Sequence, residues 1–201
     1  MKKSLRMLVV ATILTTGSYI SLPFGLLSNH ETISAAQAAG IVQLDPAQQK
    51  ELDTFFTAFS SAGLHPFRKG NLTNDEILTF AVNYNVKYNK NLKNMSDTVW
   101  GIPLQKLTDV AQNFFGMPLT IHTMNNYTLD KDLYLVPKAT GATNIFSKVD
   151  FVMDNGDGTY LANVGIYMGS SIGSSPISGS RFRALITKTP TGYNLKEYIM
   201  R

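Results

Sequence analysis

The sequence predicts an α+β fold in which three N-terminal helices pack on a twisted antiparallel sheet of about five to six strands. Apolar residues recur at helical spacing over residues 45–116, and the period changes to two from residue 118 onward. A tight turn at residues 154–158 separates two alternating runs, which is a strong hairpin signal. Helices first and strands afterwards are typical of α+β domains, and a cystatin-like or cone-like arrangement suits this order.

The first 38 residues have the pattern of a secretory signal peptide. Three basic residues lie among the first six positions, and a mostly apolar run follows over residues 7–27. Small residues come next, and cleavage is predicted between Ala38 and Ala39. An uncleaved anchor is the alternative, because residues 7–27 are about long enough to span a bilayer. The predicted organisation is a signal peptide at 1–38, a short linker at 39–43 and a single α+β domain at 44–201.

Composition limits the classes of function. The chain has no cysteine, so disulfides, thiolate metal sites and cysteine nucleophiles are excluded. Removing residues 1–38 leaves 15 basic and 13 acidic residues, a net charge of +2, which gives no case for nucleic-acid binding. No second long apolar run follows, so no membrane contact is expected after cleavage. The predicted location is secreted, periplasmic or at the cell surface.

Two helices are predicted from their caps. The first begins at Asp45-Pro46, an N-cap acceptor followed by proline at the first helical position, and Gly63 is placed at its end. The second begins at Thr73, which is three residues before Glu76, the spacing of a capping box.

The third helix is predicted over residues 103–115, with Gly116 ending it. Residues 83–95, rich in Asn and Lys, are expected to be a fraying helix end and a solvated loop. The aromatic residues of the helices are interpreted as core faces packed on the sheet, with a ligand pocket as the alternative. Trp100 is interpreted as a plug at the core edge between helices, with sugar binding as the alternative.

The strands are predicted from alternation of apolar and polar residues. They cover residues 119–124, 133–136, the hairpin of 144–168, 181–189 and 193–200. Their short connections predict antiparallel pairing. The Gly/Ser-rich segment at residues 169–180 is expected to be a loop, either an ordinary connection or a segment that closes over a partner.

Tests for a nucleophilic site are negative. Gly169, Ser171 and Gly173 fit the G-x-S-x-G pattern, which requires a helix after the serine and a histidine downstream. No helix is predicted there, and His65 and His122 both lie upstream.

The test for a metal site is also negative, whereas a catalytic carboxylate pair stays open, because such residues meet only in the fold. Residues 154–158 resemble part of a calcium loop, but Gly165 stands where the bidentate glutamate is needed. No cofactor motif is present, so no cofactor or metal is predicted. Asp150 lies between two apolar residues and is the best catalytic carboxylate candidate, although alternation places it on the outer face of its strand.

Four short motifs of core and cap residues stand out. They are Leu52-Asp53-Thr54-Phe55-Phe56 with Phe59-Ser60, Leu78-Thr79-Phe80-Ala81, Phe114-Phe115-Gly116, and Gly192-Tyr193-Asn194-Leu195 with Tyr198. This set resembles a group of uncharacterised exported proteins of Firmicutes, over about residues 44–200. The resemblance implies export and an α+β domain, and it implies no activity or binding residues.

With no chemical motif, the sequence favours a non-enzymatic binding or interaction module outside the cell or at its surface. Its partner would be an unidentified protein or an envelope ligand. The competing hypothesis is an envelope-associated hydrolase whose carboxylates meet only in the fold. A third hypothesis offers the last strand, residues 193–200, as a pairing edge in an assembly. The oligomeric state stays open, and so does the identity of any catalytic residue.

Overall fold

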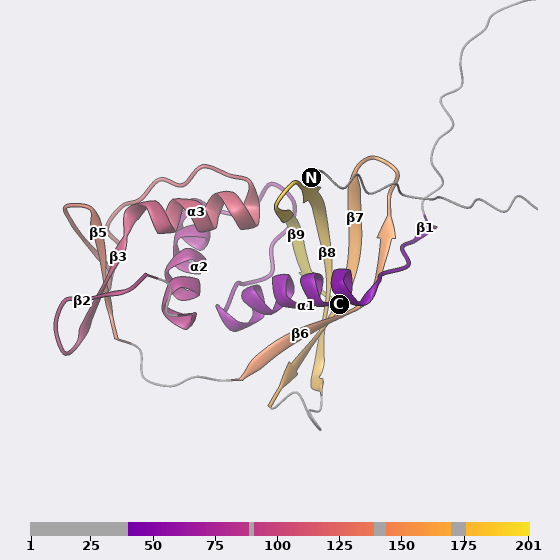
Figure 1. Ribbon diagram of the computed structural model, residues 1–201, viewed down its shortest axis with the longest axis horizontal. Helices are drawn as coiled ribbons and strands as arrows, with labels where there is room; N and C mark the ends of the chain where they lie inside the picture. The colour runs from indigo at the N-terminus through magenta and orange to yellow at the C-terminus, as the bar shows by residue number, and fades with distance from the viewer. Residues whose placement is uncertain (1–39, 89–90, 139–143, 170–175) are drawn as a thin grey trace, which may run out of the picture. The chain divides into compact units, whose positions relative to one another are not determined.

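Three helices and two antiparallel sheets make up the part of the chain that the computed structural model describes (Figure 1). The described residues are 40–88, 91–138, 144–169 and 176–201, and all belong to one unit, Ala36–Arg201. The predicted signal peptide and its cleavage site, Ala38 and Ala39, lie outside these ranges. Within the described residues, no helix is both long and apolar enough to cross a membrane.

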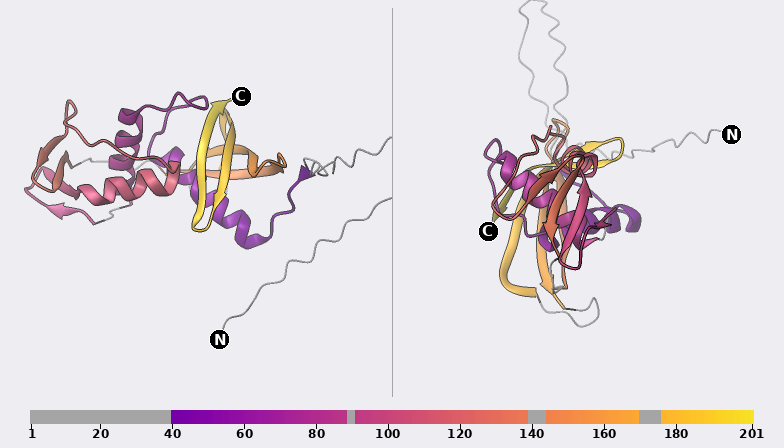
Figure 2. Two further views of the ribbon diagram at one scale, coloured as in Figure 1. Left: turned by 90° about the horizontal axis from the view of Figure 1, so that it is seen from above. Right: turned by 90° about the vertical axis from the view of Figure 1, so that its left-hand side faces the viewer.

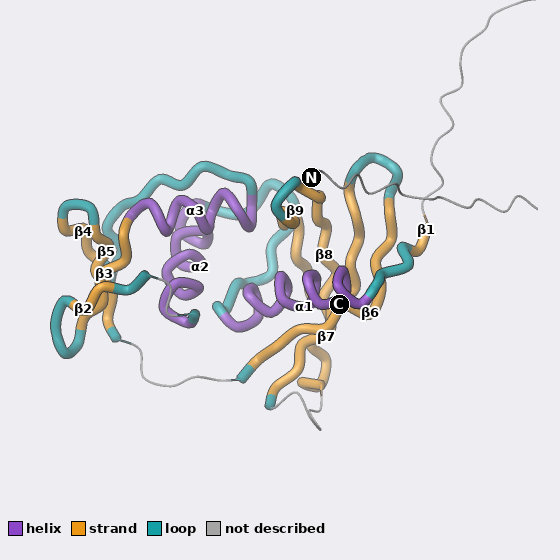
Figure 3. The backbone as a smooth tube through the Cα atoms, viewed as in Figure 1, coloured by secondary structure: helices purple, strands orange, loops and turns teal. Residues whose placement is uncertain are grey.

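The predicted α+β class is confirmed, and the helix, strand and loop segments can be followed in Figure 3. The helices are α1 (Pro46–Ser61), α2 (Asn74–Lys87) and α3 (Leu104–Phe115). One sheet has the order β1-β6-β7-β8-β9, with β1 (Gly40–Ile41), β6 (Ile145–Asp154), β7 (Thr159–Met168), β8 (Pro176–Thr189) and β9 (Gly192–Met200). The other has the order β2-β3-β5-β4, with β2 (Lys93–Asn94), β3 (Val99–Pro103), β5 (Leu133–Pro137) and β4 (Thr128–Asp130).

The predicted helix boundaries are confirmed by their caps. The Asp45 side chain accepts a hydrogen bond from the Gln48 N–H at 2.8 Å, which starts α1. Glu76 Oε2 accepts from the Thr73 N–H at 2.8 Å, completing the capping box of α2. Gly116 ends α3 with a φ of 64°, a left-handed conformation that glycine adopts without steric cost.

The second helix extends through the segment predicted as its fraying end. Residues 83–87 belong to α2 and are helical. Asn85 is buried, and its side-chain amide donates to the Ala81 carbonyl at 2.8 Å. Because this bond satisfies the polar group inside the helix, an asparagine-rich sequence does not end it here.

The predicted strand at residues 119–124 is wrong. Residues 117–123 form no strand, and only Met124 makes an isolated bridge, with Tyr127. The Asn74 side chain bonds both backbone groups of Thr120, at 2.9 Å to its N–H and 2.8 Å to its carbonyl. Alternation alone does not make a strand where a side chain supplies these hydrogen bonds in place of a neighbouring strand.

The single predicted sheet is in fact two, because residues 99–103 form β3 where a helix connection containing Trp100 was expected. This strand pairs with β5, setting Trp100 opposite Val136. Gly101 permits the close packing: a Cβ there would lie 3.1 Å from the Met95 side chain. Glycine and proline weaken the strand signal of this segment, which explains why alternation did not reveal it. Trp100 is half-buried against the core, and the Lys138 ammonium lies 4.2 Å from its ring centroid.

Aromatic side chains form the centre of the core between the helices and the five-stranded sheet. The fully buried rings include Phe56, Phe59, Phe80, Phe115 and Tyr198. They pack edge-on, tilted or stacked, with centroid distances such as 5.1 Å for Phe59 and Phe80. Such pairs contribute beyond the burial of their area.

The N-terminal part of the described chain follows the free edge of β6, which β7 pairs on its other side. Gly40 and Ile41 pair with β6 as β1, and the Val42 N–H donates to the Val152 carbonyl at 2.8 Å. The chain then enters α1, which continues along β6 as a helix. Beyond β1, the outward backbone groups of β6 are therefore paired by side chains of α1 instead of by a neighbouring strand.

Three polar side chains of α1, spaced four residues apart, replace a neighbouring strand along this edge. Asp53 Oδ1 accepts from the Val149 N–H at 2.7 Å, and Gln49 Nε2 donates to the Val149 carbonyl at 2.9 Å. Thr57 Oγ1 accepts from the Ser147 N–H at 2.9 Å. Residues at this spacing share one helix face, so a single helix can serve successive outward backbone groups of the strand.

The opposite edge of the sheet, β9, also has partners. The Tyr198 N–H and carbonyl both bond to Phe67, at 2.9 and 2.6 Å. Lys196 Nζ donates to the Phe115 carbonyl at 3.0 Å and Asn194 Nδ2 to the Asn113 carbonyl at 3.2 Å, so β9 caps the C-terminal end of α3. Figure 2 shows β9 beside β8. If the last strand pairs with another chain, it has to do so at positions of β9 that these contacts do not occupy.

Replacing Tyr198 with phenylalanine is expected to leave the free energy of unfolding unchanged or to raise it by up to about 1 kcal/mol. Tyr198 is only 1% exposed, and its hydroxyl has no hydrogen-bond partner among the described residues. An unsatisfied buried polar group costs about 1–3 kcal/mol, so removing it relieves that cost. Burial likewise raises the pKa of Tyr198. Urea unfolding of both proteins measures the difference.

Tyr134 is the matched control. It is equally buried, but its hydroxyl donates to the His122 carbonyl at 2.9 Å. Tyr134→Phe should therefore lower the free energy of unfolding by about 1 kcal/mol. Equal losses in the two variants would show that the Tyr198 hydroxyl finds a partner in solution.

Candidate functional site

An open groove lies where α1, α2, α3 and the turn between β8 and β9 meet, and we call it the aromatic groove. Its volume is about 590 Å³. Its aromatic lining consists of Phe55, Tyr84, Tyr88, Phe114 and Tyr193, with Glu51, Thr54, Asn113 and Thr191 among the polar residues. Most pockets that bind small molecules have volumes of about 300–1,000 Å³ and combine apolar walls with a few polar groups.

The rings of the aromatic groove come from four different elements. Phe55 of α1 stacks on Phe114 of α3, with centroids 5.8 Å apart and planes 10° apart. Tyr84 and Tyr88, one turn apart on α2, have centroids 4.9 Å apart. Tyr84 also meets Phe114 at 4.9 Å, and Tyr193 of β9 meets Phe55 at 5.8 Å. The rings therefore form one continuous aromatic wall.

Four of these rings lie at the edge of the core and stay partly exposed, whereas the fifth, Tyr193, is buried. Phe55, Tyr84 and Phe114 are half-buried, Tyr88 is 37% exposed and Tyr193 is 8% exposed. The interpretation of the aromatic residues as core faces is right for Phe56 and Phe115, whereas Phe55 and Phe114 are half-buried and line the groove.

A signal for the groove was present in the sequence. Phe55 directly precedes Phe56, and Phe114 directly precedes Phe115. Consecutive residues on a helix point about 100° apart, so two adjacent aromatic side chains cannot both face the same core direction. One ring of each pair had to lie at the side of the helix.

Glu51 gives the aromatic groove its charge. Among the described residues that line it, Glu51 is the only one with a charged side chain. Burial raises the pKa of Tyr193, and the negative charge of Glu51 raises it further. Burial and the neighbouring Tyr88 raise the pKa of Tyr84. Both hydroxyl groups therefore stay protonated and able to donate hydrogen bonds at neutral pH.

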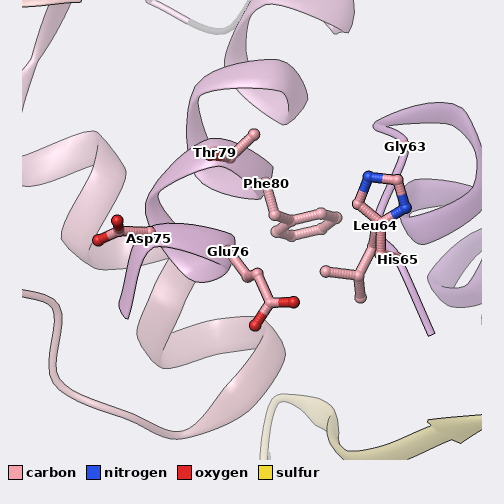
Figure 4. Close-up of a pocket in the computed structure, with 7 residues that line it drawn as sticks. All are labelled: Gly63, Leu64, His65, Asp75, Glu76, Thr79 and Phe80. Atoms are coloured by element: carbon pink, nitrogen blue, oxygen red, sulfur yellow. The ribbon is translucent and has the colours of Figure 1, made fainter. Parts of the chain in front are cut away.

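A smaller pocket, of about 250 Å³, lies at the start of α2 (Figure 4). It brings His65 near Glu76, and Asp75 lies on the opposite side of the view from His65. Glu76 Oε2 is already bonded to the N–H and hydroxyl of Thr73 at 2.8 and 2.7 Å. Asp75 Oδ1 lies 3.2 Å from His122 Nε2. In this pocket, Glu76 thus caps the start of α2, and Asp75 pairs with His122 of the irregular segment beside it.

The other acidic candidates have structural partners. Asp150 is exposed on β6 and forms an ion pair with Arg181. Asp154 accepts from the Gly156 N–H at 2.8 Å, and Asp157 accepts from the Thr159 N–H at 2.9 Å. Hydrogen bonds from Thr159, chiefly from its hydroxyl, lower the pKa of Asp157. These carboxylates organise the hairpin turn and the sheet surface.

The remaining candidates are not brought together. Ser171 and Gly173 of the G-x-S-x-G match lie outside the described residues. His65 is exposed in a loop, and His122 lies in the irregular segment beside Asp75. In the described ranges, no group of three or more His, Cys, Asp or Glu residues could hold a metal ion.

Comparison with known proteins finds no matching family model, no matching curated protein and no matching solved structure. The resemblance to exported proteins of Firmicutes therefore stays a prediction.

Proposed function

We propose that this chain is an exported, non-enzymatic binding domain and that its ligand lies in the aromatic groove. One observation carries the proposal: partly exposed rings from three helices line an open groove beside the buried Tyr193 instead of closing into the core. Exposed apolar surface is costly to keep in contact with water, and contiguous apolar surface on a folded domain is often a binding site. With the predicted signal peptide, the ligand would be met in the envelope or the medium.

The alternative, an envelope-associated hydrolase, has less support. A general acid of a hydrolase needs a raised pKa and a free carboxyl group that can reach the substrate. Asp75, Glu76 and Asp150 each engage a structural partner. Hydrogen bonds to Gln105 and Thr159 lower the pKa of Asp109 and Asp157 respectively.

We propose the cystatin-like arrangement only for α1 and the five-stranded sheet. Helix α1 lies against the five-stranded sheet, which is the relation of helix to sheet in a cystatin-like arrangement. We keep this likeness as a proposal for these elements. It does not determine the function, since one architecture serves many functions.

Fragment binding followed by NMR tests the proposed site. The isotope-labelled protein, purified from the culture medium, would be screened with a library of small aromatic and aliphatic compounds. Binding compounds should shift the amide signals of residues around Tyr84, Phe114 and Gly192. Tyr88→Ala should weaken the binding of these compounds about tenfold, because it removes one exposed ring of the wall. Tyr167→Ala, which removes a ring stacked on Phe146 elsewhere on the sheet, is the control and should have no effect. Binding that avoids the groove would refute the proposed site.

A further inference from the structure

We propose that the aromatic groove selects a small organic cation, an ammonium group carried on an apolar body. This inference rests on the proposed function and names the ligand class of that site. It depends on two features of the lining, the five aromatic rings and the single carboxylate of Glu51.

The rings supply the first contribution. The face of an aromatic ring is negative, and a cation within about 6 Å of its centre is attracted, most strongly where water is excluded. Phe55, Tyr84 and Phe114 are half-buried, so part of each ring remains accessible to a ligand in the groove. Ring centroids 4.9–5.8 Å apart form a continuous surface that can surround several methyl or methylene groups.

Glu51 supplies the second contribution. Its Oε1 would lie 3.8 Å from a Cβ placed on Gly192, so the carboxylate reaches the start of β9, directly before Tyr193. Asp45 adds to the negative potential felt by the Tyr193 hydroxyl. Among the described lining residues, none is lysine or arginine. An anion would therefore meet repulsion at this end of the groove, whereas a cation would gain a charge partner.

The volume favours a small molecule as the occupant. About 590 Å³ falls in the range of pockets that hold a compound with several rings or branches. The polar groups of Thr54, Asn113 and Thr191 can bond a hydroxyl or amide elsewhere on such a ligand.

A pair of isosteric probes tests the charge selectivity. Choline and 3,3-dimethylbutan-1-ol have nearly the same shape, and they differ in one atom, a positively charged nitrogen in place of a carbon. We expect choline to bind about tenfold more tightly, as judged by NMR titration of the purified protein. Glu51→Gln should remove most of that difference and leave the affinity for the neutral alcohol unchanged. Tyr84→Leu keeps an apolar side chain but removes a ring, and it should weaken choline more than the alcohol.

The outcomes separate the two proposals. Equal affinity for both probes in the groove would overturn the cation inference and leave the proposed binding site intact. The same holds if neither probe binds while other fragments fill the groove. If no compound of any charge binds there, the proposed function fails as well. If Glu51→Gln binds neither probe and its NMR spectrum shows that it is unfolded, Tyr84→Leu decides the question. The inference then survives only if Tyr84→Leu weakens choline more than the alcohol.

Discussion

Replacing Phe59 with alanine is expected to lower the free energy of unfolding by about 3–5 kcal/mol. Phe59 is 0% exposed, and its ring packs against Phe55, Phe80, Phe114 and Tyr198. Truncation removes apolar area and leaves a cavity that the six surrounding rings, which with Phe56 and Phe115 come from three helices and a strand, cannot readily fill. Since a domain of this size has a total stability of about 5–15 kcal/mol, the variant should be close to the limit of folding.

Phe55→Ala is the matched control for this prediction, since it truncates the same residue type one turn away on α1. Its ring is half-buried in the wall of the aromatic groove, so a smaller loss of stability is expected. Urea unfolding would compare the free energies of unfolding of the two variants, provided that this free energy depends on urea concentration with the same slope in both. Equal losses would mean that the groove is closed in solution and that Phe55 is a core residue. Such a result would also remove the basis of the proposed binding site.

The parts of the fold that the sequence predicts correctly depend on neighbours in the chain. Asp45 and Thr73 cap their own helices, and the turn at residues 154–158 joins two strands that pair with each other. Every contact needed for these predictions is within a few residues or across one hairpin. Local preference and final structure agree there, as expected for a sequence with a single folded state.

The parts that it misses depend on distant contacts. Residues 117–123 are held by Asn74, which is 46 residues from its partner Thr120. The second sheet pairs β3 with β5 across α3, and neither strand reveals its partner by alternation. The aromatic groove forms only where three helices and β9 meet, which no local pattern can show. In the sequence, only the adjacent pairs Phe55-Phe56 and Phe114-Phe115 indicate it.

The second large effect is expected at Asp53, whose replacement by alanine should lower the free energy of unfolding by about 2–3 kcal/mol. Asp53 Oδ1 accepts from the Val149 N–H at 2.7 Å and from Gln49 Nε2 at 2.9 Å. Without it, a partly buried backbone donor of β6 loses its acceptor, and Gln49 loses the contact that positions its amide. Asp53→Asn keeps an acceptor oxygen at the same place and should lose less stability. A loss in Asp53→Ala no larger than in an exposed acid of the same helix, Glu51→Ala, would contradict the contact.

A second measurement separates edge protection from general stability. A sheet edge with unpaired backbone groups pairs readily with other chains, and natural proteins block such edges. If Asp53, Gln49 and Thr57 act as a substitute strand, Asp53→Ala should form β-aggregates faster than a core variant of equal stability. Ile186→Val, truncated inside the sheet away from the edge, is a suitable comparison, with urea adjusted to give both proteins the same folded fraction. Thioflavin T fluorescence would follow the aggregation. Equal aggregation rates would mean that α1 stabilises the fold through packing alone and that the β6 edge needs no cover.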